Sequence, residues 1–182
     1  PGIVATGTGL LDVRDGKHYL GAAIAATNAR TMPFVALREA DGGYSNEFLT
    51  EPYVNPAATS AGVTATVSMV RMLPDGRAYI GGRFATLGGG ITFGQGGYEI
   101  YSLARILPDG SPDRTFANAR IEETVAPPPP QAFFPGIVRD LDIQADGRLL
   151  VVGEFTMVEG RFSRPRICRL TDTGDLDELF FV

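Results

Sequence analysis

Two runs of acidic residues are the first candidates for chemistry in this sequence. One lies around position 143 and the other near the C-terminus, and their members are Asp140, Asp142, Asp146, Asp172, Asp175, Asp177 and Glu178. Calcium needs several hard oxygen ligands on one tight loop, and a pair of carboxylates can hydrolyse a glycosidic bond. Neither run has the spacing of an EF-hand loop, and turn formation explains these acids better. We therefore predict no cofactor and no metal site, with bound Ca²⁺ as the alternative.

Arginines and loop aromatic residues are the second group of candidates. Arg161, Arg164, Arg166 and Arg169 form a local basic cluster, which is either a solvated face or a contact patch for an acidic partner surface or a glycan. Aromatic residues in loops can stack on sugars or simply pack the fold. The candidate binding residues are Phe93, Tyr98, Phe133, Phe134, Arg161, Arg164 and Arg166.

The remaining reactive groups lack the neighbours that catalysis requires. His18 is the single histidine and has no Cys or second His beside it. Cys168 has no intrachain partner and stands where Ala36 and Ala104 stand in related segments, so we predict a small buried residue. The glycine-rich stretch 88–97 is followed neither by Lys-Ser/Thr nor by a helix, which favours an inter-strand loop over a phosphate site. We predict no catalytic residue.

Composition narrows the class of protein. Apolar residues make up 44% and charged residues 20% of the 182 positions, as in folded globular domains. The net charge of −5 argues against a nucleic-acid partner. No uninterrupted apolar run reaches about 18 residues, so we expect no membrane insertion. The chain begins at Pro1 without a leader pattern, and we expect a processed product or a piece of a longer repeat array.

The segments that would position these groups occur in three copies along the sequence. Each copy contains an Asp-Gly turn, with the glycines at Gly16, Gly76 and Gly147. Alternating apolar and polar residues precede the turn and a second apolar run follows it, which predicts a β-hairpin. In the later copies Gly82 and Gly153 follow six residues after the turn glycine, which predicts close approach of two backbones. Two residues later stand Phe84 and Phe155, which we expect to be anchored in the core.

The second half of each copy predicts a third strand, a second turn and an aromatic residue. The third strands are expected at 35–36, 103–104 and 167–168, and the second-turn glycines are Gly42, Gly110 and Gly174. A phenylalanine stands six residues after each of these glycines: Phe48, Phe116 and Phe180. A fourth strand at 48–54 and 121–125 would complete a four-stranded antiparallel blade, the unit of a β-propeller.

The sequence thus predicts an all-β protein of three antiparallel propeller-like blade repeats without long helices. We expect one repeat-built domain over 1–182, divided into a degenerate first repeat at 9–55, a second repeat at 63–118, a proline-rich connection at 119–136 and a third repeat at 137–182.

The repeat resembles the delta-sixty repeat, a propeller-type repeat of bacterial and phage proteins. The resemblance rests on VRMLPDGRAYIGGRF with LARILPDGSPDRTF, and on LDIQADGRLLVVGEF with CRLTDTGDLDELF. The first copy departs from the pattern, with Ala22 for the second glycine, Leu37-Arg38 for Arg-Leu and Ser45 for the aspartate. The resemblance implies a stack of blades in proteins that are often secreted or carried on phage tails, and it implies no catalytic residue.

We expect the segments outside the repeat pattern, together with association between protein chains, to carry the function. Three blades do not close a propeller, which takes four to eight, so we expect a homo-oligomer or assembly with other virion proteins. We predict a non-enzymatic structural and interaction module of a phage tail, fibre or baseplate, located in the virion and used in assembly or host-surface glycan recognition. The presenting loops would be 25–32, 88–97, 126–134 and 157–165.

Two alternatives stay open. One is a hydrolase of cell-surface polysaccharide that uses Asp140, Asp142 and Glu99. The other is a scaffold repeat protein that is secreted or held at the bacterial cell surface.

Overall fold

The computed structural model describes residues 10–14, 16–21, 35–42, 52–53, 66–84, 86–87, 98–124 and 133–181. Every regular element in these ranges is a strand, so the all-β prediction is confirmed. Among these residues no helix is long and apolar enough to cross a membrane.

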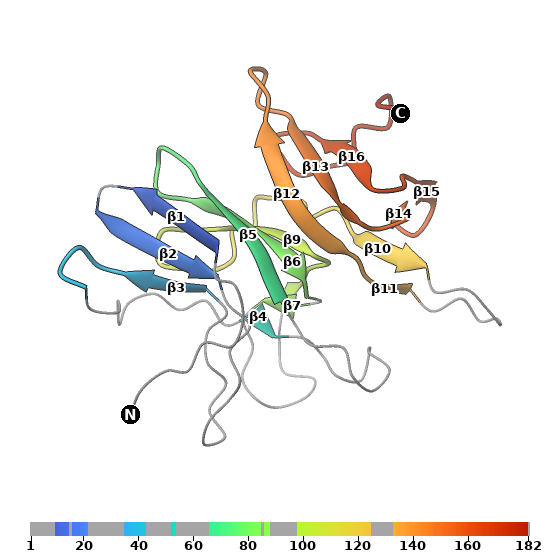
Figure 1. The fold of residues 1–182 in the computed structure, drawn as a ribbon. Coiled ribbons are helices and arrows are strands. Elements are labelled where there is room, and N and C mark those ends of the chain that lie inside the picture. Colours follow the sequence, from blue (N-terminus) through green and yellow to red (C-terminus); the bar gives the residue numbers. More distant parts are fainter. Residues whose placement is uncertain are drawn as a thin grey trace.

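Each repeat forms one three-stranded antiparallel sheet, and the three sheets lie side by side in chain order (Figure 1). In each sheet the first strand pairs with the second and the second with the third, as the repeat predicts. The strands of the first sheet are β1 (Leu10–Arg14), β2 (Lys17–Gly21) and β3 (Val35–Arg38). The strands of the second sheet are β5 (Thr66–Met72), β6 (Ala78–Arg83) and β9 (Leu103–Ile106). The strands of the third sheet are β12 (Ile137–Ile143), β13 (Leu149–Glu154) and β16 (Ile167–Leu170).

The turn glycines adopt the backbone conformation that the repeat predicts. All six have positive φ, between 75° at Gly16 and 92° at Gly174, a region that other residues rarely enter. In the second repeat the amide of Gly76 donates to the carbonyl of Leu73 at 3.1 Å. The Asp75 carboxylate accepts the amide of Arg77 at 3.0 Å and thereby closes the turn. The predicted hairpins are confirmed.

The glycines after the hairpin turn allow two backbones to approach closely, as predicted. A Cβ placed on Gly82 would lie 2.0 Å from the carbonyl oxygen of Thr66, and one on Gly153 would lie 1.9 Å from that of Ile137. The ladder shifts register at the same places, between Val67/Met69 and between Val138/Asp140. The first strands of the second and third repeats, β5 and β12, therefore carry a β-bulge that only glycine accommodates on the partner strand.

The prediction that strands at 48–54 and 121–125 complete the blades of the first and second repeats is wrong; of 48–54 the structure describes 52–53. The expected segments do form strands, but these strands belong to two smaller sheets that join neighbouring repeats. One sheet has the order β4 (Pro52–Tyr53), β7 (Thr86–Leu87), β8 (Tyr98–Glu99). The other has the order β11 (Phe133–Pro135), β10 (Ile121–Thr124), β14 (Met157–Val158), β15 (Phe162–Ser163).

The outer edge of the third strand explains this outcome. After the second turn the chain folds back on β9, where Ile106 bridges Pro112 and the amide of Asp113 donates to the carbonyl of Arg105. The third repeat repeats the arrangement, with a bridge between Leu170 and Leu176. Because the fold-back occupies this edge, a fourth strand finds no partner there and pairs instead with the small hairpin of the next repeat.

The second repeat is buried on both faces of its sheet. Met69, Tyr79 and Leu103 belong to the cluster shared with the third repeat, whereas Val70 and Ile80 belong to a second cluster. β5 packs against β1 and β2 on one side and against β12 on the other. The predicted anchors of the second and third repeats, Phe84 and Phe155, are both buried in these clusters.

Candidate binding site

An arginine–aspartate–phenylalanine cluster recurs in the second and third repeats and accounts for much of the repeated charge. In the second repeat Arg105 Nε donates to Asp113 Oδ2 at 2.7 Å, and the Arg105 guanidinium lies 4.9 Å from the centre of the Phe116 ring. Arg77 of the hairpin turn reaches the same oxygen at 3.4 Å. Burial raises the pKa of Asp113, but hydrogen bonds from Thr115 and Arg105 outweigh it and lower the pKa to about 2.

The third repeat contains the same cluster in a more exposed form. Arg169 Nε donates to Asp177 Oδ2 at 2.9 Å, and its guanidinium lies 4.7 Å from the centre of the Phe180 ring. Arg148 approaches the same oxygen at 3.3 Å. Arg169 of the basic cluster and Asp177 of the second acidic run are therefore partners that hold the fold-back of one repeat.

The acids of the first run also have structural partners. Asp146 accepts the amide of Arg148 at 3.1 Å, and this hydrogen bond is the main cause that lowers the Asp146 pKa. Asp140 accepts from the side chain of Arg71 in the neighbouring repeat at 3.3 Å and from the amide of Leu141. Asp142 is exposed on β12. Within the described ranges no three His, Cys, Asp or Glu side chains gather as a possible metal-binding group.

Three of the candidate arginines differ in environment. Arg164 is buried, donates to the carbonyl oxygens of Ser163 and Glu178, and lies 4.6 Å from the centre of the Phe181 ring. Arg166 has a positive φ of 69°, and its amide donates to the carbonyl of Phe155. Arg164 and Arg166 thus form contacts within the third repeat. Arg161 is largely exposed at the tip of the β14–β15 hairpin.

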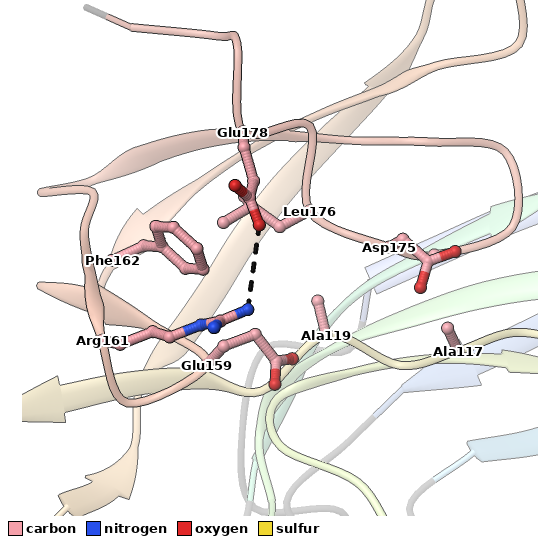
Figure 2. A pocket seen from close by; sticks show the side chains of 9 residues that line it. Ala117, Ala119, Glu159, Arg161, Phe162, Asp175, Leu176 and Glu178 are labelled. Carbon is pink, nitrogen blue, oxygen red and sulfur yellow. Dashed lines mark ion pairs between the residues drawn. The ribbon is translucent and has the colours of Figure 1, made fainter.

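Arg161 and its neighbour Phe162 line an open cavity of about 300 Å³ (Figure 2). The cavity lies where the end of the second repeat meets the hairpin and the C-terminal segment of the third repeat. Its lining residues are Ala117, Ala119, Glu159, Arg161, Phe162, Gly174, Asp175, Leu176 and Glu178. Figure 2 shows the Arg161 side chain directed toward Glu178 across the cavity, at an N–O distance of 3.7 Å.

Fixed carboxylates and one guanidinium set the chemistry of this cavity. Glu159 Oε1 accepts the amide of Arg120 at 2.6 Å, and Asp175 Oδ2 accepts the hydroxyl of Thr173 at 2.9 Å, so both acids are held in place. The Arg161 guanidinium covers Phe162 at 4.5 Å from the ring centre. Three carboxylates line the cavity against one guanidinium, so it is net acidic and disfavours anionic ligands.

The other sequence candidates lie elsewhere. Tyr98 is in β8, and Phe133 and Phe134 are in β11, whereas Phe93 and the whole loop 88–97 lie outside the described residues. Of the four loops expected to present a binding surface, 157–165 is described throughout and forms the β14–β15 hairpin. His18 is in β2.

The small buried residue predicted at Cys168 is confirmed. Its side chain is buried in the cluster between the second and third repeats, and burial raises the pKa of the thiol to about 12. Ala104, at the same position of the second repeat, is buried as well.

Sequence reasoning selected Arg161 but missed Phe162, Glu159 and Glu178 as its neighbours. Glu159 and Gly160 both have positive φ, at 56° and 63°, and form the turn that brings Arg161 over the cavity. A three-residue stretch that contains glycine, here 159–161, between two short apolar segments is a hairpin signal that could have located this turn.

A family model matches two segments of the chain, residues 73–116 and 144–180, and is described as a domain of unknown function (DUF5122), beta-propeller. The chain carries propeller-type repeats. The two segments run from the hairpin turn to the phenylalanine of the Arg–Asp–Phe cluster in the second and third repeats. Searches of curated proteins and of solved structures found no significant match.

Proposed function

We propose that this protein is a non-enzymatic structural and interaction module whose third repeat binds a neutral or amine-bearing glycan. The observation that carries the proposal is the cavity where Arg161, Phe162, Glu159, Asp175 and Glu178 meet. The propeller-type repeats serve as the rigid frame, and the β14–β15 hairpin supplies the recognition groups.

The chemistry of the cavity suits sugar hydroxyls. Carboxylates accept hydrogen bonds from hydroxyl and ammonium groups, and a guanidinium donates to ring and hydroxyl oxygens. Phe162, whose ring Arg161 covers on one face, supplies an aromatic surface that can pack against the C–H face of a sugar. The excess of carboxylates over guanidinium selects against sialylated or sulfated chains, because an anion would face Glu159, Asp175 and Glu178.

The test is a titration of the protein with neutral, amine-bearing and anionic oligosaccharides, followed by NMR chemical shifts of the labelled backbone. Neutral or amine-bearing ligands are expected to shift the amides around Arg161 and Glu178, and Phe162→Ala should abolish the shifts. Arg161→Ala should weaken them, and Arg139→Ala is the control for that variant, because Arg139, like Arg161, forms an exposed ion pair, with Glu154 on another strand. Absence of binding by the whole panel, or an equal loss in Arg139→Ala, would reject the proposal.

Two finer assignments belong to the same proposal. We infer that the repeats are of the delta-sixty type and that the protein serves in a phage tail, fibre or baseplate, in virion assembly or host attachment. The propeller-type match supports the repeat class. Probing purified particles and the secreted fraction of the source cells with an antibody distinguishes a virion location from a secreted or cell-surface one.

The hydrolase alternative is tested with the same oligosaccharides. Product release from any of them, lost in Asp140→Asn, Asp142→Asn or Glu99→Gln, would replace the binding role with an enzymatic one. The ion pair between Asp140 and Arg71 at 3.3 Å supports a structural role for that acid, in line with the non-enzymatic proposal.

A further inference from the structure

A buried carboxylate lies next to the turn that carries two residues of the cavity. Glu122 is on β10, between β11 and β14, and its side chain is fully buried. Its Oε1 accepts from Arg120 Nη2 at 2.6 Å. Its Oε2 has no hydrogen-bond partner among the described residues, and a Cβ on Gly160 would lie 3.5 Å from this oxygen. Burial of a carboxylate with one unpaired oxygen costs free energy, so packing alone does not explain Glu122.

The repeat architecture does not require a glutamate at this position. Glu122 of β10 pairs with Met157 of β14, and in the preceding contact between repeats Tyr53 of β4 pairs with Thr86 of β7. Thr86 and Met157 occupy the same position after the bulge glycine of their repeats. The same place in the strand exchange thus holds a tyrosine in one contact and a glutamate in the other.

Arg120 links Glu122 to the turn formed by residues 159–161. The amide of Glu159 donates to the carbonyl of Arg120 at 2.8 Å, and Glu159 Oε1 accepts the amide of Arg120 at 2.6 Å. The Arg120 guanidinium donates to Glu122 and lies 4.7 Å from the centre of the Tyr101 ring. Glu159 and Arg161 line the cavity from this turn (Figure 2). A change at Glu122 therefore reaches two groups of the cavity.

Few charges influence the ionisation of Glu122. Burial raises the pKa of Glu122, the Arg120 guanidinium opposes this effect, and the Glu159 carboxylate adds to it. The Gly160 amide favours the ionised form, although it does not reach hydrogen-bond geometry. β11 and β14, which flank β10, contribute no charged residue. β12, which also packs against β10, carries Arg139, Asp140 and Asp142, and the first two form ion pairs with other residues. The net result is a pKa of Glu122 above its ordinary value of 4.5.

We propose that Glu122 is a positioning residue of the cavity, whose ionised carboxylate holds the 159–161 turn in the ligand-binding arrangement and whose protonation releases it. Protonation removes the charge with which Arg120 pairs. Because Arg120 occupies Oε1, the proton goes to Oε2, where its O–H group faces the N–H of Gly160 and two donors meet. The turn then shifts, Glu159 and Arg161 leave their places, and ligand affinity falls in acid. The loss of affinity rests on the proposed function, whereas the shift of the turn is measured without a ligand.

The first measurement is an NMR pH titration of the labelled protein without ligand. The wild-type amides of Gly160 and Arg161 are expected to titrate with a midpoint above pH 4.5, the ordinary value for a glutamate. In Glu122→Gln these amides should already have their acid positions at pH 7 and keep them down to about pH 5.5, because the side chain cannot ionise. Glu123→Gln is the matched control, since Glu123 is the next residue of the same strand and is 39% exposed. It should titrate as the wild type does.

Two further measurements separate positioning from a structural role. Arg120→Gln should move the midpoint to higher pH, because it removes the charge that favours ionised Glu122, and its half-exposed side chain makes the change compatible with folding. Since burial disfavours the ionised form in the folded protein, Glu122→Gln should unfold at no lower urea concentration than the wild type at pH 7. A destabilised Glu122→Gln whose turn amides keep their wild-type positions would indicate a structural role and overturn the proposal.

The ligand measurement uses the neutral oligosaccharide with the highest affinity in the panel, because a neutral ligand does not itself titrate. Its Kd with the wild type is expected to rise about tenfold as the pH falls through the Glu122 midpoint, and with Glu122→Gln it should be equally high at pH 7. Turn amides that titrate alike in wild type and Glu122→Gln, or a constant Kd while the turn titrates, would overturn the proposal. Titration of the turn in a protein that binds no oligosaccharide would support the control of the turn by Glu122 and reject the proposed function alone.

Discussion

Replacing Asp113 by Asn tests whether the Arg–Asp–Phe cluster holds the repeats together. The Asp113 side chain is 5% exposed and its partner Arg105 is 9% exposed. Removing the charge leaves the Arg105 guanidinium buried without its counter-ion, which typically costs about 3–5 kcal/mol. Asp177→Asn in the third repeat removes the same contact where Asp177 is 11% and Arg169 26% exposed. Because water reaches that pair, we expect a loss of only about 1 kcal/mol.

The assay is urea unfolding followed by circular dichroism, with both variants measured against wild type at pH 7. The reasoning is refuted if the two variants lose equal free energy of unfolding, or if Asp113→Asn loses less than about 1 kcal/mol. Equal losses would mean that the depth of burial in the contact between repeats does not determine the strength of the pair.

The same variant carries a prediction about pH. The pKa of Asp113 in the folded protein, about 2, is below the ordinary value of 3.8. The ionised carboxylate therefore stabilises the fold above pH 4, and this contribution is lost as the pH falls toward 2. It amounts to about 2 kcal/mol. The difference in unfolding free energy between wild type and Asp113→Asn should shrink by up to that amount between pH 6 and pH 2, and a constant difference would contradict the lowered pKa.

Three further predictions test the core and the bulge. Phe155→Ala should cost about 3–5 kcal/mol in urea unfolding, since it empties a buried ring site; an unchanged midpoint would show that the anchor is misplaced. Gly153→Ala should destabilise the protein more than Gly147→Ala, because its Cβ would overlap the carbonyl of Ile137 whereas Gly147 has space but positive φ; the reverse order of melting temperatures would argue against the bulge. Cys168 should not react with a maleimide at pH 8 until urea unfolds the protein, because the thiol is buried with a pKa of about 12, and rapid labelling of the native protein would show that this core opens.

The elements that local chemistry determines could be predicted from the sequence. Asp-Gly turns need a positive φ at the glycine, and the spacing from each turn to its strands is constant, so the three sheets and their order follow from the repeat. The close approach of two backbones at Gly82 and Gly153 could also be predicted, because glycine recurs at the same offset from the turn in both repeats, inside a strand where a larger residue is otherwise expected. These features depend on contacts within one repeat.

The partner of the fourth strand could not be predicted in the same way. The composition and length of β10 are compatible with a strand, and nothing in its residues shows whether it pairs with β9 or with another strand. The fold-back through Pro112 and Asp113 determines the partner of β10, because it occupies the outer edge of β9. β10 therefore pairs with β14 of the next repeat. The competition between two partners for one sheet edge is a tertiary effect that periodicity does not record.

The cavity depends on that same exchange of strands. Because the end of the second repeat crosses to the third, Ala117 and Ala119 form one side of a space whose other sides come from the β14–β15 hairpin and the C-terminal segment. A repeat that kept its fourth strand would close its own sheet and would place no residue of one repeat against the hairpin of the next. Two of the three carboxylates that face the cavity, Asp175 and Glu178, belong to the acidic run near the C-terminus, whereas the third, Glu159, comes from the separate β14–β15 hairpin. The acidic run alone therefore did not reveal the site, because another member, Asp177, holds the fold-back. A glycan bound there would contact two repeats at once, so its binding should stiffen the contact between the second and third repeats.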